Sequence, residues 1–172
     1  MKKIISFTIL TVSALLFYAC DNSSNPQDSY DTPPASNVID WNEKPQSCTV
    51  QANNDTIGFV VTLKNWSWKQ TGLYNENKSH IINTFTGIEE SVFNFICNQT
   101  KKSIDYLQKD NDKLKVTNFS CTENNIIIDE IIDATTAASL TTETLVNNTR
   151  LICKDILNKT VKEGFFSDED DE

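Results

Sequence analysis

The distribution of proline divides this chain of 172 residues into a part that can fold and a part that cannot build a core. All four prolines lie in the segment 21–46, which is rich in Asn, Ser and Asp. Such a composition buries too little apolar surface to offset the cost of ordering, so we expect an extended, disordered tether. Trp41, with Val38 and Ile39, is the exception and is expected to dock onto the folded part. The fold must come from residues 47–166, a length typical of one domain with a single core.

The first 19 residues have the pattern of an export signal. Lys2 and Lys3 precede an uncharged run from Ile4 to Ala19. A short basic start, an apolar stretch and a small residue before the cleavage point are the parts of such a signal. The run is shorter than the roughly 20 apolar residues that a membrane-spanning helix needs, and no later segment approaches that length. We therefore predict that residues 1–19 are a cleaved signal peptide.

Cys20 follows directly, in the sequence Leu16-Phe17-Tyr18-Ala19-Cys20. This resembles the signal of bacterial lipoproteins, in which a small residue precedes a cysteine that is lipidated and becomes the new N-terminus; that signal usually has Leu where Phe17 stands. The resemblance implies a diacylglycerol thioether and an amide-linked acyl chain on Cys20. Two or more chains hold a protein stably on a membrane. Residues 20–46 would then be the lipid-anchored tether; an ordinary cleaved signal, with Cys20 unmodified, is the alternative.

Four cysteines remain once Cys20 is set aside. They are Cys48, Cys97, Cys121 and Cys153. An even set in an exported chain predicts two disulfides, with buried free thiols as the alternative. The chain has no CxxC and one histidine, so a zinc-like site is not expected. Four cysteines allow three pairings, among which sequence alone cannot choose; we favour Cys48 with Cys97 and Cys121 with Cys153.

Apolar spacing predicts a similar order of elements in the two halves of the domain. In the first half we expect strands at 48–52, 57–63 and 80–86, a looser stretch at 66–78 and a helix at 92–107. Thr86 to Glu89 has the form of a capping box before this helix. In the second half we expect strands at 113–122 and 126–132, then one long helix that begins at Asp133 and ends at Gly164.

The predicted fold class is α+β. An antiparallel sheet would carry both helices on one face, as a two-layer sandwich. Each half has one cysteine at a strand and one in a helix. A duplicated strand-strand-helix unit is therefore possible, in which each disulfide would join a helix to its own half of the sheet.

No residue pattern indicates catalysis, so we expect neither an enzyme nor a cofactor. His80 is the only histidine, and no known catalytic motif surrounds it. Asp129 and Glu130 would point to opposite faces of a strand, which is poor geometry for acid–base chemistry. A secreted hydrolase is a remote alternative, and it would need His80 in a cleft beside Ser, Cys or a carboxylate.

Charge argues against nucleic acid as a partner. Without Lys2 and Lys3 the chain keeps 13 basic residues against 24 acidic ones, and such a surface repels a phosphate backbone. Several of the acidic residues lie in the last segment, 167–172, which we expect to be a disordered, solvated tail.

Trp66 and Trp68 are the candidate ligand-binding residues. Residues two apart in a strand share a face, so two exposed indoles would form a platform for sugar rings or for a protein partner. The sequence favours core or partial burial for them.

Taken with the signal and the tether, these features predict an envelope lipoprotein with a binding or scaffolding domain. Its anchor would hold it on a membrane, and its further partner would be an envelope protein or a polysaccharide. A carbohydrate-binding module that uses Trp66 and Trp68 is the alternative.

Overall fold

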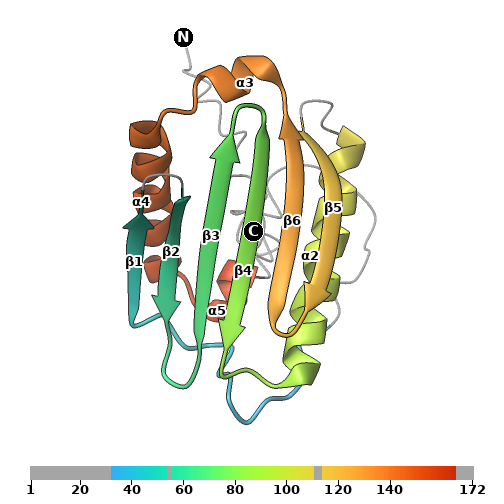
Figure 1. The fold of residues 1–172 in the computed structure, drawn as a ribbon. Helices are drawn as coiled ribbons and strands as arrows, with labels where there is room; N and C mark the ends of the chain where they lie inside the picture. The colour runs from blue at the N-terminus through green and yellow to red at the C-terminus, as the bar shows by residue number, and fades with distance from the viewer. Residues whose placement is uncertain (1–31, 54–55, 111–113, 166–172) are drawn as a thin grey trace, which may run out of the picture.

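The computed structural model describes residues 32–53, 56–110 and 114–165. In this part of the chain six strands form one antiparallel sheet, and the two long helices lie on one of its faces (Figure 1). The strands are β1 (Ser47–Ala52), β2 (Thr56–Thr62), β3 (Ser67–Asn75), β4 (Lys78–Thr86), β5 (Leu114–Thr122) and β6 (Asn125–Ile132). The helices are α2 (Glu90–Asp110), α3 (Ala134–Ala138), α4 (Thr142–Asn158) and α5 (Val161–Phe165). The predicted α+β class is confirmed.

The strand order across the sheet is β1-β2-β3-β4-β6-β5. Neighbouring strands from β1 to β4 follow one another in the chain, but β6 enters between β4 and β5. The tight turn between β5 and β6 contains Glu123 and Asn124, both with positive φ, as hairpins with a two-residue type I′ turn require. In Figure 1, α4 lies behind β1 and β2, and α2 lies behind the β5 end of the sheet.

The core lies between the sheet and the helices. Along β6, Ile126, Ile128, Glu130 and Ile132 are buried, and the residues between them are half-buried. This alternation is the pattern of a strand with one face on a core. Phe59, Trp68 and Phe85 supply the largest apolar side chains of the same face. The ring of Trp68 stands edge-on to Phe59 and is stacked with Phe85.

The domain begins upstream of the predicted boundary at Ser47. Ile39 is 4% exposed and belongs to the core, and Trp41 packs edge-on against Phe95. Backbone N–H groups of α5 donate to this segment, from Val161 to Glu43 O at 2.9 Å and from Lys162 to Trp41 O at 2.7 Å. Docking of Val38, Ile39 and Trp41 is therefore confirmed. The expectation of disorder is wrong for residues 36–46, because their apolar side chains and carbonyl groups find partners on the domain.

Strand β3 corrects one prediction. The stretch 66–78, expected to be looser, contains a strand of nine residues. Its core-facing positions include Trp68, Gln70 and Gly72, so a polar residue and a glycine interrupt the apolar alternation that would have revealed it.

The C-terminal helices differ from the single helix predicted between Asp133 and Gly164. Asp133 caps only the short helix α3, because Thr135 N donates to Asp133 Oδ1 at 3.0 Å. Thr141 then caps α4 by accepting a hydrogen bond from Thr144 N. Gly164 lies inside α5 and does not end the long helix. Threonine serves as a helix cap better than as an interior residue, so the Thr-rich stretch divides the helix.

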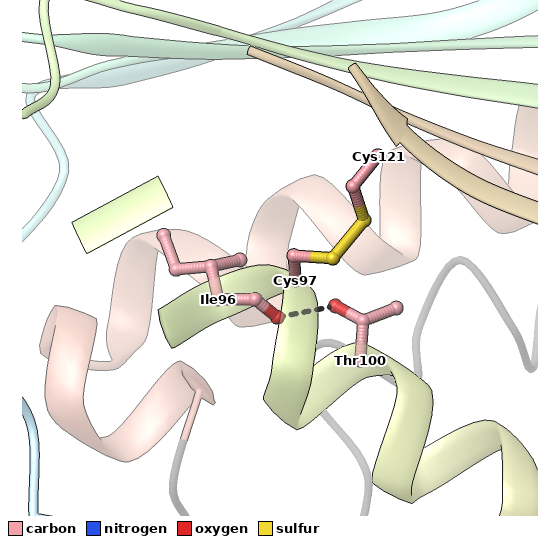
Figure 2. The surroundings of a disulfide bond; sticks show 4 residues. All are labelled: Ile96, Cys97, Thr100 and Cys121. Carbon is pink, nitrogen blue, oxygen red and sulfur yellow. Dashed lines mark hydrogen bonds between the residues drawn. A yellow bond between two sulfur atoms is a disulfide. The ribbon is translucent and has the colours of Figure 1, made fainter. Parts of the chain in front are cut away.

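The two disulfides join Cys48 to Cys153 and Cys97 to Cys121, with Cα–Cα distances of 5.3 and 6.3 Å. Figure 2 shows the second pair, which joins α2 to β5 beside Ile96 and Thr100. The two expected disulfides are therefore confirmed, but the favoured pairing of Cys48 with Cys97 and of Cys121 with Cys153 is wrong. Each helix packs on strands from the other half of the chain, α4 on β1 and β2, and α2 on β5. Four strands precede α2 and two precede α4, so the halves do not repeat one unit.

Candidate functional site

Both predicted ligand-binding tryptophans are buried. Trp66 is 4% exposed and Trp68 is 1% exposed. Trp66 Nε1 donates to Glu43 Oε1 at 3.0 Å, and Trp68 Nε1 donates to Asn83 Oδ1 at 3.0 Å. A platform for sugar rings needs exposed indole faces. The pair therefore belongs to the core, as the sequence favoured, and carries no binding site of that kind.

Other predicted residues fall outside the part of the chain that the structure describes. These are the signal 1–19, Cys20 and the acidic tail 167–172. Among the described residues, no helix combines the length and the apolar character that a membrane span requires. Nor do three or more His, Cys, Asp or Glu side chains gather there as metal ligands would.

The sheet has a second face that no described helix covers (Figure 1). On β3, β4 and β6, the residues of this face alternate with the buried ones. Strand register arranges the side chains in cross-strand rows, and we call this surface the open face. Its rows are Ser47–Thr62–Ser67–Thr86, Thr49–Val60–Lys69–Thr84–Asn125–Thr122, Gln51–Gly58–Thr71–Ile82–Ile127–Ser120, Thr56–Leu73–His80–Asp129–Asn118 and Asn75–Lys78–Ile131–Lys115.

A histidine–carboxylate pair lies near the middle of the open face. His80 Nδ1 is 2.5 Å from Asp129 Oδ1, and Asn118 Nδ2 donates to Asp129 Oδ2 at 2.8 Å. The hydrogen bond from His80, with a second from Asn118, lowers the pKa of the Asp129 carboxyl group below its usual value. An anionic Asp129 fixes the imidazole ring by its Nδ1 side. Among the described residues no hydroxyl or thiol group hydrogen-bonds the other ring nitrogen. The structure thus places a carboxylate beside His80, which is one of the neighbours that the hydrolase alternative required.

Positive charge predominates on the open face. Its rows hold three lysines and a single acidic residue, Asp129, which pairs with His80. The lysines are Lys69, Lys78 and Lys115. All three are exposed, and none has an ion-pair partner among the described residues. The whole chain, by contrast, has a formal net charge of −9. The open face is therefore the part of the sheet suited to an anionic ligand.

A small hollow lies on the open face where β2 passes between β1 and β3. Its volume is about 60 Å³, and its lining residues are Gln51, Asn53, Thr56, Ile57, Gly58, Lys69, Gln70 and Thr71. Gly58 carries no side chain, because the backbone of β3 occupies the place that a Cβ atom would take. A Cβ atom there would stand 1.9 Å from the carbonyl oxygen of Gln70, so no other residue fits the position. The lining offers amide, hydroxyl and ammonium donors and includes no carboxylate.

The core side of the same strands holds a buried carboxyl group. Glu130 is 1% exposed, and Ser79 Oγ donates to its Oε2 at 2.8 Å. Its Oε1 has no hydrogen-bond partner. Burial, with a smaller contribution from the neighbouring charge of Asp129, raises the pKa of Glu130 to about 7, although the hydrogen bond from Ser79 acts in the opposite direction. The prediction that Asp129 and Glu130 point to opposite faces is confirmed.

The open face could not be predicted from the sequence, because its rows depend on strand register. A local signal existed in β6, where Ile127, Asp129 and Ile131 alternate with the core residues. The position of β6 beside β4, which brings Asp129 to His80, has no signal in the sequence.

Comparison of the chain with models of protein families, with curated proteins and with solved structures finds no match.

Proposed function

We propose that the chain is an exported protein, anchored by lipid on Cys20 to a membrane of the bacterial envelope. Its domain binds an envelope partner through the open face and acts by binding rather than by catalysis. The observation that carries the proposal is the one-sided sheet, in which helices cover the core face and leave six strands open (Figure 1). The face of a sheet that carries apolar residues is usually buried. The half-buried aliphatic side chains on the open face are therefore suited to contact with a partner.

Those aliphatic side chains are spread over the open face, and all but Val60 lie in the row of the His80–Asp129 pair or in a row next to it. They are Val60, Ile82, Ile127 and Ile131, all half-buried, and Leu73, which is 42% exposed. The surface therefore combines apolar contact area with fixed polar groups, which is the composition typical of recognition surfaces.

The N-terminal segment supports the anchor part of the proposal. Residues 36–46 hold the domain at several points, including hydrogen bonds from Trp66 Nε1 and Lys64 N to the carboxylate of Glu43. Force applied to the tether would therefore be transmitted through these contacts to the core of the domain. The two disulfides are compatible with an oxidising compartment outside the cytoplasm.

Mass spectrometry and fractionation test the anchor. The full chain with its own signal, made in a bacterial host, should yield a mature N-terminus at Cys20 that carries acyl mass and a protein that sediments with membranes. Cys20→Ala should release it into the soluble fraction with both disulfides intact. A soluble wild-type protein with an unmodified N-terminus would overturn the anchor.

Lysine labelling in intact envelopes tests the open face, and the chain supplies its own controls. Lys69, Lys78 and Lys115 lie on the open face, whereas Lys101 and Lys154 are exposed on α2 and α4. With an amine-reactive reagent, the first three should react more slowly in envelopes than in the purified protein. The two helix lysines should react equally in both. Equal reactivity of all five in both preparations would show that nothing covers the open face.

A further inference from the structure

We propose that the partner of the open face is an anionic glycan, whose carboxylate or phosphate group occupies the hollow over Gly58 against Lys69. This inference rests on the proposed function, because it names the chemistry of the ligand that the open face would bind.

Charge indicates an anionic partner and argues against a second copy of this chain. Lys69, Lys78 and Lys115 have no partners among the described residues, and the one acidic residue of the face is held by His80. Two copies packed face to face would bring unpaired lysines together, which is unfavourable when they lose contact with water. An anionic ligand gives each lysine a charge-assisted hydrogen bond.

The other side chains of the open face indicate a glycan rather than a bilayer. Most of them carry hydroxyl or amide groups, which can both donate hydrogen bonds to sugar hydroxyls and accept them. Proteins that lie on a bilayer insert large apolar side chains. On the open face only Leu73 is both large and apolar and more than a third exposed, and the rows contain no Phe, Tyr or Trp. A surface rich in hydroxyl groups therefore suits a hydrated polymer.

The hollow over Gly58 supplies a place for the anionic substituent. About 60 Å³ leaves room for a group of the size of a carboxylate or phosphate. Lys69 contributes the cation, and Gln51, Thr56 and Thr71 contribute neutral hydrogen-bonding groups. Lys69 belongs to the next cross-strand row, so a sugar ring seated over that row could direct its charged group into the hollow.

Binding of defined polymers to the purified domain tests the inference. The probes are polygalacturonate, which carries carboxylates, a phosphomannan, which carries phosphates, neutral dextran, inorganic polyphosphate and phosphatidylglycerol vesicles. We expect saturable binding to at least one of the two anionic glycans, weakened by salt, and none to dextran. Polyphosphate and vesicles should bind more weakly, because they offer charge without sugar hydroxyls.

Three matched variants locate the site. Lys69→Gln should weaken glycan binding about tenfold or more, because it removes a charge-assisted hydrogen bond. Lys154→Gln on α4 makes the same charge change on the helix side and should have no effect. Lys78→Gln, on the open face but outside the hollow, should have an effect of about twofold. Circular dichroism spectra like that of the wild type would show that all three variants fold.

Three outcomes would overturn the inference. They are no binding to either anionic glycan, equal binding to polyphosphate or to vesicles, and equal loss of affinity in all three lysine variants. The proposed function is tested separately by lysine labelling in envelopes, because protection of the open-face lysines does not depend on the kind of partner. Protection without glycan binding would leave the open face as a binding surface for a different class of partner.

Discussion

Glu130 leads to a quantitative prediction about how the stability of the domain depends on pH. Its carboxyl group is 1% exposed, receives one hydrogen bond from Ser79, and has an oxygen without a partner. These conditions favour the protonated form, and the pKa rises from 4.5 to about 7. The carboxyl group of Asp129, on the other face, has a lowered pKa and so ionises below this range.

The direction of the effect follows from proton linkage. In the unfolded chain Glu130 loses its proton near pH 4.5, whereas the folded protein keeps it until about pH 7. The stabilisation from the protonated carboxyl group is therefore fully present below pH 4.5 and is lost as the pH rises to about 7. Between pH 5 and pH 8 the free energy of unfolding should fall by about 2–3 kcal/mol from this group.

Urea unfolding at intervals between these pH values, with both disulfides intact, measures the effect. Glu130→Gln keeps a carbonyl oxygen for Ser79 but cannot ionise. It should therefore be about as stable as the wild type at pH 5 and about 2–3 kcal/mol more stable at pH 8. Glu123→Gln, at an exposed turn, should follow the wild type at every pH. Parallel curves for Glu130→Gln and the wild type would refute the assignment of the pH dependence to Glu130.

Further predictions concern covalent and polar contacts, and urea unfolding tests each. Replacing Cys48 and Cys153 by Ala should cost about 5 kcal/mol by loop-closure entropy, because their separation is 105 residues; the other disulfide, with a separation of 24, should cost about 3.5 kcal/mol. Equal costs would contradict this account. Glu43→Ala should cost about 1–3 kcal/mol, because it leaves a buried indole N–H without an acceptor, whereas Glu76→Ala, at an exposed position, should change little. Thr141→Ala should cost about 1 kcal/mol through loss of the α4 cap, and an unchanged midpoint would contradict that role.

Local periodicity was sufficient to predict much of the sheet and one helix. The alternation of Ile57, Phe59 and Val61 predicted β2, because a strand with one buried face repeats every two residues. The apolar spacing from Val92 to Leu107 predicted α2, whose observed end at Asp110 agrees with the polar residues there.

The remaining features depend on contacts between distant parts of the chain. The pairing of Cys48 with Cys153 requires α4 to lie on β1, which no local pattern encodes. The His80–Asp129 contact requires β6 to enter the sheet beside β4. Glu130 could not be recognised as a core residue, since carboxylates are almost never fully buried and its alternation with isoleucines is visible only once the core face is known.

The central claim is that a partner in the envelope covers the open face. Photo-crosslinking in intact cells tests it most directly, with a photoreactive amino acid at Thr84, in the middle of the open face, or at Lys154, on the helix side. The account predicts that the Thr84 probe gives a discrete crosslinked species of higher mass in the envelope, and that the Lys154 probe does not. Crosslinks from Lys154 but none from Thr84 would contradict it.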